Sequence, residues 1–145
     1  MLGERSQFGP HKIGTPRSMG EAKYRILICE DSAAMRGLVA ATVEEVEGAE
    51  VVETDGGYAA LKLLPRERFD LIITDINMPD INGLELIRFV RQSQAHKDVP
   101  LVIISTESTE RDRERGMELG ASAYLTKPFE PEVLLGIVRR LLGIG

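Results

Sequence analysis

Acidic side chains stand directly after two of the most apolar segments of the chain. The segment LIIT, residues 71–74, ends at Asp75, and the segment YRILIC, residues 24–29, ends at the pair Glu30 and Asp31. Carboxylates that lie close together repel one another unless a cation lies among them. A set of oxygen ligands suits Mg²⁺ completed by water and a carbonyl group. These three acids are therefore candidate ligands of one Mg²⁺ ion.

Two further segments end in residues that could handle a phosphoryl group. The segment VPLVII, residues 99–104, is followed by Ser105 and Thr106, and the segment ASAYLT, residues 121–126, is followed by Lys127. A lysine supplies a compact positive charge, and a hydroxyl supplies a hydrogen-bond donor. Beside a bound cation, these groups would serve a doubly charged phosphoryl group. The set predicts that Asp75 accepts a phosphoryl group.

The elements that would position these residues alternate along the chain. Strands are expected at residues 24–29, 50–54, 70–75, 99–105 and 121–126, and helices at about 32–47, 58–64, 83–94, 108–119 and 130–143. Because parallel neighbours require right-handed crossover helices, this alternation predicts an α/β fold with a parallel sheet covered on both faces. Ligands of such sheets bind beyond the carboxyl ends of the strands. The candidate residues all lie at those ends.

Composition limits the class of protein. The chain has 145 residues, which is enough for one domain, and a net charge of −5, which argues against direct binding to nucleic acid through the overall charge. It contains no apolar run of about 18 residues, so no membrane contact is expected. The single cysteine, Cys29, excludes a disulfide framework and fits a buried position in a cytoplasmic protein.

The first 22 residues differ from the rest of the chain. They contain four glycines and two prolines and show no apolar period, so we expect a flexible N-terminal lead at 1–22 and a single domain at 23–143.

Four segments together closely resemble the response-regulator receiver family of two-component signalling, including its chemotaxis regulators. They are ICEDS, ITDINMPDINGLEL, VIISTES and AYLTKPFEPEVL, and the likeness runs from about residue 24 to residue 142. An acidic pair, a D-x-x-M-P-x-x-x-G turn and a K-P-F at matching strand ends make a specific set. The resemblance implies a doubly wound, flavodoxin-like fold with strand order 2-1-3-4-5.

The resemblance also implies a role for each candidate residue. Asp75 matches the phospho-accepting aspartate, and Glu30 and Asp31 match the acidic pair that holds Mg²⁺ directly or through water. The backbone carbonyl of Asn77 would complete the metal shell. Lys127 matches the phosphate-binding lysine, and its bond to the following proline is expected to be cis.

A switch is implied at Ser105 and Tyr124. Ser105 matches the hydroxyl that turns toward the phosphoryl group, and Tyr124 matches the aromatic residue that changes rotamer with it. Together they would rearrange the surface of the fourth helix, fifth strand and fifth helix. In the expected helix at 130–143, one set of apolar residues suffices for a core stripe: Val133, Leu134, Ile137, Val138 and Leu141. Leu135 and Leu142 widen the apolar arc to about 200°, against a usual stripe of a little over 100°. The excess indicates a partner surface or a homodimer contact.

Two polar residues are candidates for tuning the loss of the phosphoryl group. Asn77 stands two residues beyond Asp75, and Glu107 stands two residues beyond Ser105. Both side chains could reach the path of an attacking water. The same pairing of an amide and an acid resembles that of chemotaxis regulators, which lose their phosphoryl group quickly. We therefore expect substitutions at either position to alter the dephosphorylation rate.

These observations predict a receiver domain that stands alone in this chain and is phosphorylated by a sensor histidine kinase. It would gain and lose its own phosphoryl group rather than turn over a substrate, and chemotaxis or motility is the candidate pathway. Three alternatives stay open. The chain could be the receiver of a larger transcription factor or hybrid kinase, a receiver-shaped scaffold that signals without phosphate, or an Asp-nucleophile phosphatase. The phosphatase requires a second acid two residues beyond the nucleophile, where this chain has Asn77.

Overall fold

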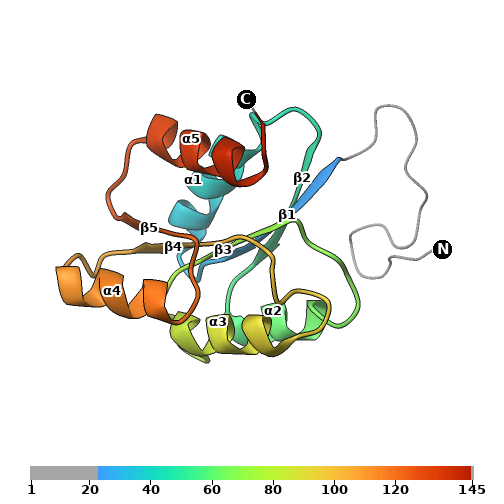
Figure 1. Ribbon diagram of the computed structural model, residues 1–145. Helices are drawn as coiled ribbons and strands as arrows, with labels where there is room; N and C mark the ends of the chain where they lie inside the picture. The colour runs from blue at the N-terminus through green and yellow to red at the C-terminus, as the bar shows by residue number, and fades with distance from the viewer. Residues whose placement is uncertain (1–22, 145) are drawn as a thin grey trace.

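The computed structural model describes residues 23–144, which form one five-stranded sheet flanked by helices (Figure 1). The sheet has the order β2-β1-β3-β4-β5, and every neighbouring pair of strands is parallel. The strands are β1 (Tyr24–Cys29), β2 (Ala49–Thr54), β3 (Leu71–Thr74), β4 (Leu101–Ser105) and β5 (Ala123–Thr126). The predicted fold class and strand order are confirmed.

Helices cover both faces of the sheet. Figure 1 shows α1 and α5 on one face and α2, α3 and α4 on the other. Their bounds are α1 (Ala33–Val43), α2 (Gly57–Leu63), α3 (Gly83–Gln92), α4 (Glu110–Glu118) and α5 (Pro131–Leu141). Each helix falls in a segment where one was predicted, with ends a few residues inside or beside the expected ones. Between residues 23 and 144, no helix has the length and apolar character needed to cross a membrane. The predicted N-terminal lead lies outside the described residues.

The central strands explain why the chain adopts this arrangement. β3 and β4 are buried along their whole length, as is the second half of β1. Successive side chains of a strand point to opposite faces, so the two faces bury separate apolar clusters. Leu27, Ile72 and Ile103 pack on one face, and Ile26 and Ile73 pack on the other. Burying both clusters fixes the strands side by side, with their carboxyl ends at one edge.

Cys29 and Val133 were both predicted to be buried, and only Cys29 is. Cys29 is 1% exposed, and burial raises the pKa of its thiol to about 12, which fits the predicted buried position. Val133, which was predicted to lie in the core stripe of α5, is instead 48% exposed. The helix turns Leu134 and Val138 into the core, so that Val133 falls on the outer side.

A buried histidine lies in the segment between α3 and β4, near the amino end of the sheet. His96 is 1% exposed, and its Nε2 accepts a hydrogen bond from the backbone N–H of Phe69 at 3.2 Å. Burial, the largest cause, and the charge of Arg68 lower the pKa of His96. The folded protein therefore favours the neutral imidazole.

This lowered pKa predicts acid sensitivity of folding. As the pH falls, the unfolded chain takes up a proton on His96 before the folded protein does. The contribution of His96 to the free energy of unfolding is therefore complete above about pH 6.5, and it is lost as the pH falls from there toward the pKa of the folded state. His96→Gln keeps an acceptor for Phe69 and removes the titration. We expect the free energy of unfolding, measured with urea at pH 8 and at pH 5.5, to fall less for His96→Gln than for wild type. Equal falls would contradict this assignment.

Candidate functional site

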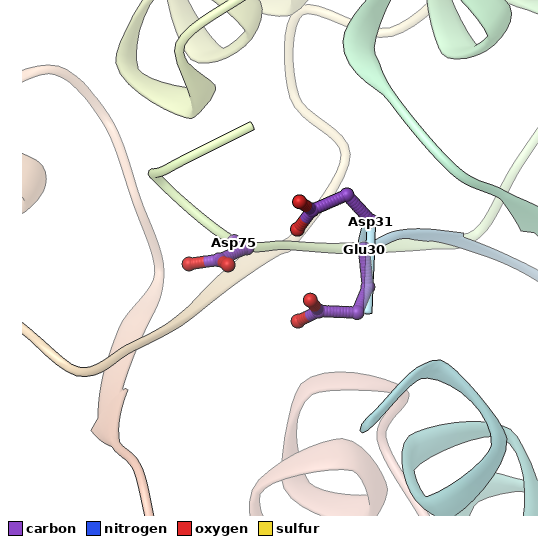
Figure 2. Close-up of side chains that lie close together, drawn as sticks. All are labelled: Glu30, Asp31 and Asp75. Atoms are coloured by element: carbon purple, nitrogen blue, oxygen red, sulfur yellow. The ribbon is translucent and has the colours of Figure 1, made fainter. Parts of the chain in front are cut away.

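Three carboxylates meet at the carboxyl edge of the sheet. Because β1 and β3 are neighbours, Glu30 and Asp31 at the end of β1 lie beside Asp75 at the end of β3. Figure 2 shows the carboxylates of Glu30 and Asp31 on the side that faces Asp75. One ligand oxygen from each acid lies within 4.8 Å of the others, and Glu30 and Asp75 are buried while Asp31 is exposed. The acids predicted to share one cation are therefore brought together.

Backbone groups hold the two buried acids in place. Glu30 Oε2 accepts a hydrogen bond from Ser32 N at 3.0 Å, and Arg36 donates to the Glu30 carbonyl at 2.8 Å. Asp75 Oδ1 accepts from Ile76 N at 2.7 Å. The turn after each strand therefore orients the carboxylate that the strand delivers.

Lys127 joins the cluster from the end of β5. Its Nζ lies 2.8 Å from Glu30 Oε1 and 3.1 Å from Asp75 Oδ2, with only 11% of the side chain exposed. Burial lowers the pKa of Lys127, but hydrogen bonds and charge from Glu30 and Asp75 outweigh it, so the pKa lies above its ordinary value. The lysine is thus a fixed cation. The bond between Lys127 and Pro128 is cis, as predicted.

The charges and ligands of this cluster fit a hard divalent cation. Three carboxylates face a single lysine, which leaves an excess of negative charge in a small volume. All the candidate ligand atoms are oxygens, and the exposed position of Asp31 leaves room for water to complete a Mg²⁺ shell. The backbone of Asn77 lies next to this set, since its N–H is 3.4 Å from Asp75 Oδ1.

Ser105 and Tyr124 converge on the backbone of one residue. Ser105 Oγ accepts a hydrogen bond from Glu107 N at 3.0 Å, and the Tyr124 hydroxyl donates to the Glu107 carbonyl at 2.6 Å. Both side chains are buried. Burial is the main cause that raises the pKa of Tyr124, so its hydroxyl remains protonated and able to donate. A movement of the backbone at Glu107 would therefore change the hydrogen bonds of both Ser105 and Tyr124.

The two predicted tuning residues also meet. Asn77 Nδ2 donates to Glu107 Oε2 at 3.1 Å, which connects the turn after β3 with the turn after β4. Thr106 is different, because it is exposed beside Ser105, and no hydrogen bond joins its side chain to the cluster among residues 23–144. The structure gives Thr106 a place at the edge of the site but no contact within it.

Sequence reasoning missed Asp80 and Arg36. Asp80 accepts hydrogen bonds from Gly57 N and Tyr58 N, the first amides of α2. A helix that begins at two glycines has no N-cap side chain of its own, and this was the signal for a capping acid elsewhere. Arg36 left no such signal, because nothing in its local sequence indicates the Glu30 carbonyl that it contacts.

Known proteins resemble most of this chain. Residues 26–139 match the family described as "Response regulator receiver domain". A Picosynechococcus protein named "Probable transcriptional regulatory protein" is 40% identical over 127 residues, covering 83% of this chain and 49% of that protein. A Campylobacter jejuni "Chemotaxis protein CheY homolog" is 34% identical over 122 residues, covering 83% of this chain and 94% of that protein.

A solved structure has the same fold. The structure of the chemotaxis response regulator CheY4 of Vibrio cholerae superimposes with a TM-score of 0.76 at 35% identity, over 83% of this chain and 98% of that one. The matched part of this chain thus spans about half the length of the Picosynechococcus relative and nearly all of the two chemotaxis proteins.

Proposed function

This chain belongs to the response regulator receiver family, and from that premise we propose that it accepts a phosphoryl group on Asp75 in a reaction that requires Mg²⁺. Receiver domains are signalling modules of two-component systems rather than enzymes that turn over a substrate. The observation that carries the proposal is the meeting of the Asp75 carboxylate with the Glu30 and Asp31 carboxylates and the Lys127 ammonium group.

The transfer is a displacement at phosphorus. An oxygen of the Asp75 carboxylate forms a bond to phosphorus while the bond from phosphorus to the donor breaks, and the donor group leaves with the electron pair. The donor is a phosphohistidine of a sensor histidine kinase or a small phosphodonor, and the product is an acyl phosphate. Bound Mg²⁺, with the three acids and the Asn77 carbonyl as ligands, would neutralise charge on the phosphoryl oxygens.

Protein groups supply the rest of the positioning. Lys127 now bridges Glu30 and Asp75 and would turn part of its charge to the phosphoryl oxygens. Ser105 would give up its hydrogen bond with the Glu107 amide and form one with the phosphoryl group. Thr106 would lie at the edge of the site. Because the Tyr124 hydroxyl is bonded to the carbonyl of the same Glu107, the tyrosine would respond to that exchange.

The output surface is proposed on α4, β5 and α5. Tyr124 lies in β5, and exposed apolar side chains occur on the flanking helices, Met117 on α4 and Val133 on α5. A downstream protein is the proposed partner of this surface, with a homodimer as the second candidate. A role in chemotaxis as a single domain is supported by the likeness to the CheY homologue, whose length the chain nearly spans. A cytoplasmic location remains a prediction.

Intact-mass measurement tests the proposal. Incubation of the wild-type protein with Mg²⁺ and acetyl phosphate should add the mass of one phosphoryl group, and a chelator of Mg²⁺ should prevent the addition. An unchanged mass under both conditions would contradict the proposal. Continuous release of phosphate from phosphate esters, read in a colour assay, would instead support the phosphatase alternative.

The Asn77 and Glu107 side chains give a prediction about the lifetime of the acyl phosphate. Their hydrogen bond of 3.1 Å joins two turns beside Asp75, where polar groups can orient an attacking water. We expect Asn77→Ala and Glu107→Ala each to slow dephosphorylation on the order of tenfold, because the water loses its orientation. The double variant should be little slower than either single one, since the two residues act together.

The decay of the phosphorylated mass with time measures this effect. Ser108→Ala is the matched control, because Ser108 is an exposed neighbour on the same turn. A decay rate that is the same in wild type and in all three variants would remove Asn77 and Glu107 from the dephosphorylation step.

A further inference from the structure

Helix α2 is capped by an acid from a different part of the chain. Its N-cap residue, Gly56, has no side chain that could accept a hydrogen bond. The first amides of the helix, Gly57 N and Tyr58 N, donate instead to Asp80 Oδ1 and Oδ2, each at 3.0 Å. Asp80 belongs to the loop at residues 76–82, which joins β3 to α3. These hydrogen bonds hold the pKa of Asp80 below its ordinary value, so the carboxylate is ionised at neutral pH.

The two glycines at the start of α2 allow the loop to lie directly against the helix. A Cβ atom added at Gly56 would lie 2.8 Å from Asp80 Oδ2, and one added at Gly57 would lie 2.7 Å from Ile81 Cβ. The backbone of Gly56 is extended, with φ of −174°, which any residue can adopt. Close approach of the loop, rather than backbone conformation, therefore requires a glycine at Gly56.

The same loop forms one wall of the carboxylate cluster. It begins directly after Asp75, whose Oδ1 accepts hydrogen bonds from Ile76 N at 2.7 Å and Asn77 N at 3.4 Å. It ends where Gly83 N donates to the Ile76 carbonyl at 2.8 Å. Between those ends, Asp80 connects the loop to α2. The position of the Asn77 backbone beside Asp75 thus depends on a loop that is held to its neighbour by Asp80.

We propose that Asp80 is a positioning residue for phosphoryl acceptance, which it serves by fastening the Asp75 loop to the start of α2. The inference rests on the proposed function, because it assigns Asp80 to the same reaction. Asp80 does not itself touch the carboxylate cluster. It acts through the loop backbone, so its loss should weaken Mg²⁺ binding and slow the transfer even when the helix is intact.

A rescue variant separates this role from simple helix capping. Asp80→Ala removes both the cap of α2 and the connection of the loop to α2, and it clears the space beside Gly56. Adding Gly56→Ser in that background gives α2 an N-cap side chain of its own, since serine is among the preferred N-cap residues. The double variant should restore the stability of α2, but it should not restore the hydrogen bonds that hold the loop to the start of α2. Gly57→Ala is an independent variant, because it displaces Ile81 while alanine favours the helix.

The experiment compares these variants with wild type and with Glu45→Ala, which removes an exposed acid in the turn after α1. Amide hydrogen exchange reports on residues 57–63 and 76–82 separately, calorimetry gives the Mg²⁺ affinity, and intact mass gives the rate with acetyl phosphate. For the double variant we expect wild-type protection in α2, faster exchange in the loop, Mg²⁺ affinity several-fold lower and phosphorylation about tenfold slower. Gly57→Ala should show the same loop, Mg²⁺ and rate effects.

Distinct results would overturn the inference and the proposed function. Wild-type Mg²⁺ affinity and wild-type phosphorylation in the double variant would show that Asp80 only caps α2. Wild-type values in Gly57→Ala, together with faster exchange in the loop, would show that the position of the loop does not affect the reaction, and this too would overturn the inference. Slower phosphorylation with unchanged loop exchange would also overturn the positioning role. A wild-type protein that is never phosphorylated would instead refute the proposed function, and the inference would fall with it.

Discussion

Asp75→Asn is expected to abolish phosphorylation of the protein. An amide oxygen is a much weaker nucleophile than a carboxylate oxygen and cannot form a stable acyl phosphate, so no phosphoryl group should be added from acetyl phosphate. The fold should survive, because the side-chain oxygen of asparagine can still accept the hydrogen bond that Ile76 N donates to Asp75 Oδ1. The loss would therefore be chemical rather than structural.

A matched acid-to-amide change provides the control. Asp70 is an exposed acid at the other end of β3, and its Oδ2 accepts a hydrogen bond from Arg25 N at 2.7 Å, which asparagine could also accept. With Mg²⁺ and acetyl phosphate, intact mass should show the phosphoryl group on wild type and Asp70→Asn and none on Asp75→Asn. Full phosphorylation of Asp75→Asn would place the acceptor elsewhere.

Lys127→Met is expected to separate metal binding from phosphoryl transfer. The ammonium group lies 2.8 Å from Glu30 and 3.1 Å from Asp75, so its removal leaves two buried carboxylates without their cation. Without Mg²⁺, the variant should be less stable than wild type, because the carboxylates repel one another. Its Mg²⁺ affinity should equal or exceed that of wild type, because the ion no longer competes with the lysine.

Phosphoryl transfer should nevertheless be much slower in the Lys127→Met variant. The phosphoryl oxygens lose a fixed positive charge, and removal of one such stabilising group typically costs about 10²–10³ in rate. Calorimetry with Mg²⁺ and the initial rate of mass increase with acetyl phosphate measure the two effects. Lys97→Met, at an exposed position far from the edge that carries the site, is the control. A variant with a wild-type rate would remove Lys127 from the reaction.

The fold was predictable where burial and local sequence agree. The apolar runs of β1, β3 and β4 gave strands that are covered on both faces, and the segments between strands gave helices. The order of the strands was a different matter, because apolar pattern alone does not say which strand neighbours which. That order came from the resemblance to the receiver family, and the structure confirms it.

The site was predictable to the extent that its residues follow strand ends. Glu30, Asp31, Asp75 and Lys127 were expected at one edge of the sheet, and the parallel register brings them together. The capping of α2 by Asp80 was not foreseen, because it joins residues more than twenty positions apart through a loop whose path no local pattern fixes. The exposure of Val133 was missed for a related reason, since neighbouring elements set the rotation of a helix about its axis.

Identification of the phosphorylated residue tests phosphoryl acceptance on Asp75 most directly. The wild-type protein is incubated with Mg²⁺ and acetyl phosphate, the acyl phosphate is reduced with borohydride to a stable alcohol, and the modified residue is located by peptide mass spectrometry. We expect the modification at Asp75 alone, and none when Mg²⁺ is chelated. A modification at Asp31 or any other residue, or one that forms equally well without Mg²⁺, would contradict the assignment of this site.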